Sequence, residues 1–197
     1  MSFLTGTSAE LIYQSTASGT AKNTFTTEVR INDDAGMGPQ ACLPPYFWQP
    51  TSSQSKGRGI LIRAAGLLNI TGTPTFTWSI RTGARDTVAT DNQVLATAAQ
   101  TVSTNATNWI LEGYVMMETV GAFGKNSTVR GQGYVMGNFG ASSAFVYVPL
   151  FGAAASPGTV ATIDISITNY INFNAACNTS SASNGITLHS LSVWGLN

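Results

Sequence analysis

The sequence predicts an all-β protein, a two-sheet antiparallel sandwich built as a single jelly roll of about eight strands. Apolar and polar residues alternate with a period of two over most of the chain, and Gly, Pro and Asn separate the alternating stretches. No window carries a helical apolar stripe, so the strands can bury their apolar faces only against another sheet. One domain is expected at 197 residues. The jelly roll is favoured because immunoglobulin-like sandwiches use only about 100 residues.

The N-terminal segment is weakly patterned and rich in Ser, Thr and Gly. We expect residues 1–20 to form an arm or extended segment and residues 21–197 to form the jelly-roll domain. No basic stretch followed by an apolar one begins the sequence, so no signal peptide is expected. No run approaches 18 apolar residues, so no membrane span is expected.

The strand candidates follow from the alternation. At 74–81, apolar Phe76, Trp78 and Ile80 alternate with polar residues, and residues 160–173 alternate in the same way and predict one long strand. Near the C-terminus the apolar positions change parity, which predicts a β-bulge near His189 and Ser190. The candidates in order are 10–15, 24–31, 58–70, 74–81, 93–103, 109–119, 127–136, 144–150, 160–173 and 186–194.

The segment 43–50 (LPPYFWQP) is the most unusual in the chain, because two prolines precede three consecutive aromatic residues. Two interpretations stay open. The segment could fill the core as a linker, since each buried aromatic removes a large area from water. Alternatively, Tyr46, Phe47 and Trp48 could anchor an interface, where Tyr and Trp are enriched.

The composition excludes several classes of function. Only 9% of residues are charged, nine basic against nine acidic, while 43% are hydrophobic, which is the reverse of a disordered chain. A net charge of zero argues against nucleic-acid binding. One His and two Cys are too few for a typical zinc site, so no metal is expected. Cys42 and Cys177 are interpreted as reduced thiols, and a disulfide between them stays possible.

Catalytic constellations are missing from the sequence. His189 is the only imidazole and lies within a strand candidate, so a surface or interface role is expected. Asp33 and Asp34 fall in a turn, and Glu112 and Glu118 lie on the polar face of a strand. No pair of carboxylates stands out for glycoside hydrolysis. We therefore expect no catalytic residues, no cofactor and no enzymatic activity.

Two glycine-containing segments suggest nucleotide binding only superficially. Residues 121–127 (GAFGKNS) lack the glycine spacing of a phosphate-binding loop and are expected to form a hairpin loop. Residues 131–133 (GQG) lie within a strand candidate and predict a bulge or a close backbone approach.

The low charge predicts association. A surface whose polarity comes from Ser, Thr, Asn and Gln loses less free energy on desolvation than a charged one. A net charge near zero promotes self-association. A homo-oligomer docked on a larger surface is therefore expected.

Seven segments of the sequence carry a resemblance: 24–28 (TFTTE), 43–48 (LPPYFW), 59–66 (GILIRAAG), 71–76 (TGTPTF), 108–113 (NWILEG), 129–133 (VRGQG) and 186–191 (ITLHSL). In these segments the chain resembles small structural proteins of tailed bacteriophages, most closely the capsid decoration (cement) proteins. The resemblance implies a virion protein on the capsid surface, made in the host cytoplasm. It further implies a homotrimeric jelly roll that binds across subunits of the major capsid protein and stabilises the shell.

A second hypothesis is a receptor-binding or carbohydrate-binding jelly roll of a phage tail. Such sites stack sugars on exposed aromatic rings, and the candidates are Tyr46, Trp48, Tyr114 and Tyr134. An open aromatic platform would favour sugar binding. Burial of these rings at a three-fold interface would favour a cement protein.

Overall fold

The protein is an all-β sandwich, as predicted. The structure is a computed structural model that describes residues 9–32, 37, 41–49, 57–84, 88, 90–103, 108–140, 145–152, 156 and 158–196. A 3-10 turn, η2 (Ala122–Gly124), accompanies the strands. The strands are β1 (Ala9–Gln14), β2 (Lys22–Asn23), β3 (Val29–Arg30), β4 (Cys42–Leu43), β5 (Gly59–Asn69), β6 (Thr75–Gly83), β7 (Asn92–Thr97), β8 (Gln100–Thr101), β9 (Asn108–Thr119), β10 (Ser127–Gly137), β11 (Val146–Phe151), β12 (Val160–Ile163), β13 (Asn169–Cys177) and β14 (Gly185–Leu196).

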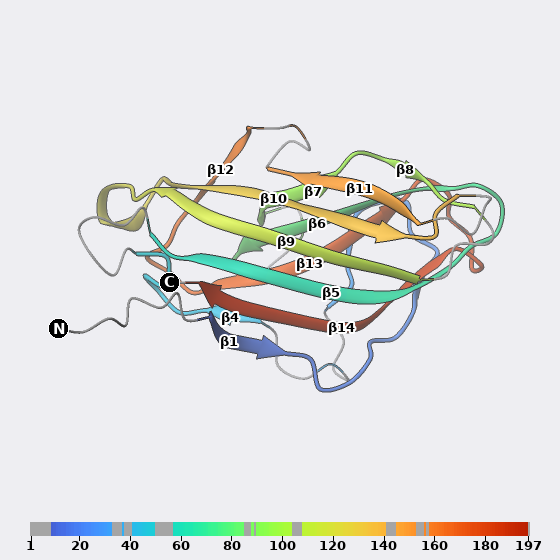
Figure 1. Ribbon diagram of the computed structural model, residues 1–197, viewed down its shortest axis with the longest axis horizontal. Helices are drawn as coiled ribbons and strands as arrows, with labels where there is room; N and C mark the ends of the chain where they lie inside the picture. Colours follow the sequence, from blue (N-terminus) through green and yellow to red (C-terminus); the bar gives the residue numbers. More distant parts are fainter. Residues whose placement is uncertain are drawn as a thin grey trace.

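Two layers form from one continuous antiparallel sheet that folds over on itself. The front sheet has the order β1-β14-β5-β9-β10-β11, and the back sheet has the order β7-β6-β13-β3. They are joined where β11 pairs with β7 through Leu150 and Thr97. Figure 1 shows β5, β9, β10 and β14 in front of β6 and β13. Fourteen strands exceed the expected eight, and five of the fourteen are four residues long or shorter.

Aromatic side chains fill the space between the layers. The ring of Trp109 on β9 lies 5.4 Å from that of Phe173 on β13, and Trp78 lies 5.1 Å from Phe139. The alternation predicted at 74–81 is confirmed, because Phe76, Trp78 and Ile80 are fully buried. Along β5 and β9 the burial likewise alternates from residue to residue, so one face of each strand forms the core and the other faces outward.

The predicted bulge in the last strand is confirmed, because the register between β14 and β5 shifts between Leu188 and Ser190. The single strand predicted at 160–173 is wrong. The carboxylate of Asp164 accepts hydrogen bonds from the backbone N–H and the hydroxyl of Ser166, at 2.9 and 2.5 Å. This local bonding turns the chain and ends β12, so that Ile167 is exposed.

Two further predicted strands differ from the structure. Within 24–31 only Val29 and Arg30 form a strand, β3, because β2 ends at Asn23 and Thr24 then has a left-handed φ of 60°. The predicted strand 93–103 is divided into β7 and β8, which both pair with β6. The pairing register of β8 with β6 is shifted by one residue from that of β7 with β6. An extra residue between these two short pairings is the physical reason for the break.

Glycine lets the two layers approach closely at β10. A Cβ atom on Gly131 would lie 2.3 Å from the Val94 carbonyl oxygen of β7, which is too close for any other residue. The predicted close backbone approach at 131–133 is thus confirmed. Residues 121–126 form the predicted hairpin loop between β9 and β10, with Phe123 at its tip.

The ends of the described chain lie side by side, because Ala9 pairs with Leu196. Residues 9–14 of the expected arm form the edge strand β1, whereas 1–8 and the acidic turn of Asp33 and Asp34 lie outside the described residues. Cys42 is exposed and Cys177 buried, and both are free thiols, which confirms the reduced interpretation. In the described part of the chain no helix is long and apolar enough to cross a membrane.

Candidate functional site

The outward face of the front sheet aligns polar side chains from neighbouring strands. Cross-strand pairing places Ser192 of β14 opposite Arg63 of β5, Arg63 opposite Glu112 of β9, and Glu112 opposite Tyr134 of β10. The alignment continues to β1 at one end and to β11 at the other. We call this set the central row: Gln14, Ser192, Arg63, Glu112, Tyr134 and Pro149.

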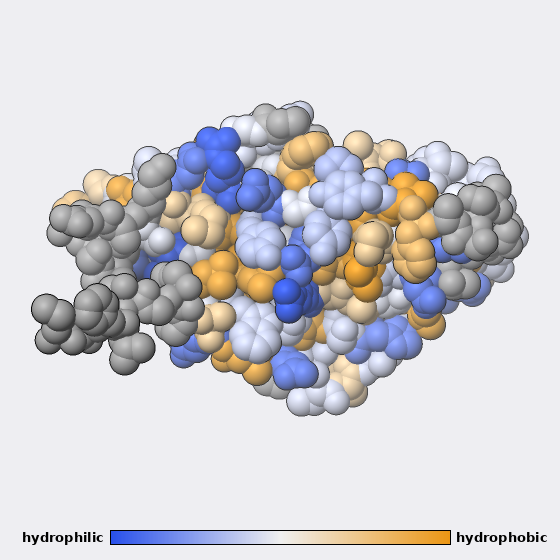
Figure 2. All heavy atoms as spheres, in the orientation of Figure 1, coloured by the Kyte–Doolittle hydropathy of each residue, from blue (hydrophilic) through white to orange (hydrophobic). Residues whose placement is uncertain are grey.

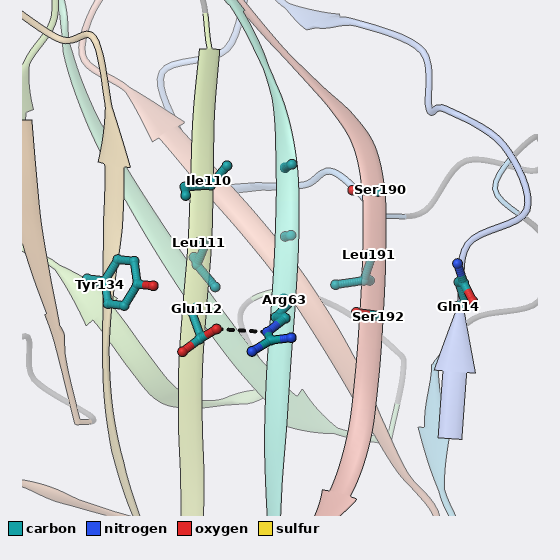
Figure 3. A pocket seen from close by; sticks show the side chains of 11 residues that line it. Gln14, Arg63, Ile110, Leu111, Glu112, Tyr134, Ser190, Leu191 and Ser192 are labelled. Atoms are coloured by element: carbon teal, nitrogen blue, oxygen red, sulfur yellow. Dashed lines mark hydrogen bonds and ion pairs between the residues drawn. The ribbon is translucent and has the colours of Figure 1, made fainter. Parts of the chain in front are cut away.

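A groove runs along the central row because the adjacent outward positions carry small side chains. Ser190 and Ala65 are paired there, and Ile110 lies opposite Ala65. The groove has a volume of about 410 Å³. Figure 3 shows side chains from five neighbouring strands lining it, with Tyr134 at one side and Gln14 at the other.

Glu112 is the centre of the polar contacts in the groove. Its Oε2 accepts a hydrogen bond from Arg63 Nε at 2.7 Å, and its Oε1 accepts one from the Tyr114 hydroxyl at 2.9 Å. The dashed line in Figure 3 marks the hydrogen bond between Arg63 and Glu112. Both carboxylate oxygens are thus engaged, which fixes the orientations of the guanidinium group and the phenol ring. The hydrogen bond to Glu112, followed by burial, raises the pKa of Tyr114 above its ordinary value of 10.0.

This shift predicts a loss of stability at alkaline pH. Burial also raises the pKa of Tyr13 above 10.0, so above pH 10 the folded chain holds protons that the unfolded chain has released. The stabilisation is present below the unfolded pKa and is lost as the pH rises through the folded pKa. Urea unfolding at pH 8 and pH 10.5 should show a smaller alkaline loss in Tyr114→Phe than in the parent. An equal loss in the two proteins would contradict this assignment.

An aromatic platform forms where Tyr134 of the central row meets Tyr147 of β11. The rings of Tyr134 and Tyr147 are stacked, with centroids 5.2 Å apart and an angle of 29° between their planes. Tyr147 is 61% exposed. A second groove of about 480 Å³ continues across this part of the sheet, and Tyr114, Gln132, Tyr147 and Phe151 contribute to its lining.

The face as a whole mixes apolar and polar side chains. Figure 2, which views the front sheet from outside, shows blue, pale and orange groups interspersed over the middle of the molecule. Leu67, Ile110 and Met116 are among the large apolar side chains exposed on the outward positions of β5 and β9. Such a mixture suits a ligand with both apolar and hydrogen-bonding surfaces.

The residues proposed as interface anchors separate in the structure. Phe47 and Trp48 are buried in the core, as expected if this segment is a core-filling linker, whereas Tyr46 is 44% exposed. Tyr46 lies next to the β9–β10 hairpin, since its N–H donates to the Ile165 carbonyl and Ile165 N–H donates to Gly124. It is therefore not part of the central row.

Of the aromatic candidates for sugar stacking, Tyr114 and Tyr134 are half-buried and lie on the same face, on paired strands. Trp48 is buried. The sequence did not identify Tyr147, Arg63 or Gln14 as site residues. Each joins the site only through cross-strand pairing, which linear spacing does not reveal.

The remaining titratable candidates are in ordinary surface settings. His189 is exposed, with Ser18 Oγ 3.5 Å from its Nδ1, which agrees with the surface role predicted for it. Glu118 pairs with Arg130 at 2.5 Å. Among the residues that the structure describes, no group of three or more His, Cys, Asp or Glu side chains could hold a metal ion.

Comparison with known proteins gives little similarity at the level of sequence. No family model matches the chain, and no curated protein matches it. A solved structure described as the CBM2 module of the evolved Dit of Lactobacillus casei BL23 phage J-1 is similar at 10% sequence identity, with a TM-score of 0.33. That similarity covers 97% of this chain and 97% of the other.

Proposed function

We propose that the protein is a non-enzymatic, glycan-binding β-sandwich that holds its ligand on the outward face of the front sheet. The stacked pair of Tyr134 and Tyr147 beside the polar central row carries this proposal. A pyranose ring has an apolar C–H face and a rim of hydroxyl groups. The aromatic platform can pack against the C–H face, and the polar side chains of the central row can form hydrogen bonds with the hydroxyl groups.

The polar groups have complementary roles toward sugar hydroxyls. The Arg63 guanidinium has several N–H donors, while Glu112 Oε1 and Oε2 are acceptors held in place by Arg63 and Tyr114. Adjacent hydroxyl groups of a sugar can donate to the carboxylate and accept from the guanidinium at the same time. Because the pair is already formed without ligand, little side-chain entropy is lost on binding.

Truncation of the platform tests this function. We expect Tyr134→Ala and Tyr147→Ala each to weaken glycan binding by about tenfold or more, because aromatic anchors dominate binding energies. The measurement is isothermal titration calorimetry with a glycan selected on a microarray. Phe123→Ala is the matched control, since Phe123 is 89% exposed and lies on the β9–β10 hairpin. Binding that survives both tyrosine substitutions would refute the proposal.

We further propose that this chain acts as a component of a phage virion, in accordance with its resemblance to phage structural proteins. The second candidate function, capsid decoration, is favoured by the exposure of Leu67, Ile110 and Met116 on the same face. A homotrimer that docks on the major capsid protein would cover these side chains. Co-sedimentation with empty shells, compared between the parent and Met116→Asp, distinguishes this role from glycan binding, because Met116 lies outside the lining of both grooves. Retention of the parent on the shells and loss of the variant would favour decoration.

A further inference from the structure

We propose that the ligand of this face is an unbranched, neutral glycan that lies across the strands, along the central row. This inference rests on the proposed function and names the ligand class of that site. It depends on three features of the described residues: the direction of the groove, the distribution of hydrogen-bonding groups along it, and the pairing of its charges.

The direction of the groove is set by the strands that line it. Its lining comes from β1, β14, β5, β9 and β10, which are neighbours in the sheet, so its long axis crosses the strands (Figure 3). Strands are about 4.8 Å apart, so the six positions of the central row extend over about 24 Å. A single sugar is much shorter than this. A chain of several sugars is needed to contact the whole row, and each sugar then faces approximately one strand.

Hydrogen-bonding side chains occupy the central row from Gln14 to Tyr134, and not only the positions next to the aromatic platform. Starting from β1, the row contains the amide of Gln14, the hydroxyl of Ser192, and then the Arg63–Glu112 pair. Tyr134, stacked on Tyr147, follows, and Pro149 ends the row. A ligand confined to the platform would leave Gln14 and Ser192 without a role in binding. An extended chain can contact every one of these groups.

The charge pairing favours a neutral chain. The two arginines on outward positions of β5 and β10 both have carboxylate partners: Arg63 Nε lies 2.7 Å from Glu112, and Arg130 Nε lies 2.5 Å from Glu118. An anionic sugar would approach these carboxylates and compete with them for the same guanidinium groups. A neutral sugar can form hydrogen bonds with both ion pairs without breaking them.

The test is a length series on the intact protein. Calorimetric titrations would use linear neutral oligosaccharides of one to six units, chosen from the polymer that binds on a microarray of neutral, branched and anionic glycans. We expect affinity to rise with length up to about five units and then to level off, because five neighbouring strands line the groove and each sugar faces approximately one strand. Equal affinity for monosaccharide and hexasaccharide, or preference for branched or anionic chains, would overturn the inference and leave glycan binding intact. No binding to any glycan would overturn the proposed function itself.

A variant at the far end of the row separates an extended ligand from a short one. Gln14→Ala should lower the affinity for the hexasaccharide by about three- to tenfold and leave that for the disaccharide unchanged, provided that the disaccharide occupies the platform. Gln100→Ala, on the back sheet, is the matched control and should change neither affinity. An unchanged hexasaccharide affinity in Gln14→Ala would overturn the extended placement.

Discussion

Replacement of Trp109 by alanine is expected to lower the free energy of unfolding by about 3–5 kcal/mol. The side chain is 1% exposed and lies between the layers, where its ring packs 5.4 Å from Phe173 of the back sheet. Its Nε1 donates to the Leu67 carbonyl at 3.3 Å. The substitution therefore removes apolar contacts, leaves a cavity and leaves a carbonyl acceptor without this donor.

Urea titration followed by far-ultraviolet circular dichroism measures this loss. Phe123→Ala removes an aromatic ring that is 89% exposed, and its free energy of unfolding should stay within about 0.5 kcal/mol of the parent. A loss below about 1 kcal/mol in Trp109→Ala would show that the two layers do not depend on this contact.

The sequence predicted the front sheet well because each of its strands has one buried and one exposed face. Strands expected at 58–70, 109–119 and 127–136 are β5, β9 and β10, with ends within one residue of the prediction. The bulge at Ser190 was predictable for the same reason, since a change of parity in the buried positions requires an extra residue.

Strand β13 of the back sheet was less predictable, because most of its residues are buried on both faces. In β13 the apolar Phe173 and the polar Asn172 and Asn174 are all fully buried, so alternation no longer distinguishes inside from outside. Asn172 donates to the buried carboxylate of Asp91, and Arg30 also contacts that carboxylate, at 3.2 Å. Such polar contacts between distant segments leave no periodic signal in the sequence.

The candidate site was only partly predictable. Tyr114 and Tyr134 were among the candidate rings for sugar stacking, and both lie on the proposed face. Their partners depend on register: Tyr147 reaches Tyr134 only because β11 pairs with β10 at Val135 and Val148. A shift of one residue in that pairing would turn Tyr147 to the opposite face of the sheet.

A large loss of glycan affinity is expected when the floor of the groove is filled. Ala65→Trp should lower glycan affinity by at least about 100-fold, which corresponds to about 2.7 kcal/mol, because the indole would occupy the space above the central row. Ala65 is paired with Ser190 on one side and Ile110 on the other, and its small side chain helps to keep the groove open. Calorimetric titration measures the affinity, and thermal unfolding verifies that the variant is folded.

The control for this variant is Thr162→Trp, which adds a large ring at an exposed position of β12, outside the groove. It should bind glycan as the parent does. If Ala65→Trp keeps its affinity while folded, the ligand does not enter the groove, and the Arg63–Glu112 pair has only a structural role. If both tryptophan variants lose binding, the effect comes from the added ring and not from its position. If only Ala65→Trp loses glycan affinity, binding requires the small side chain of Ala65. Cross-strand pairing places this residue between Ser190 and Ile110, where the sheet surface is hollow.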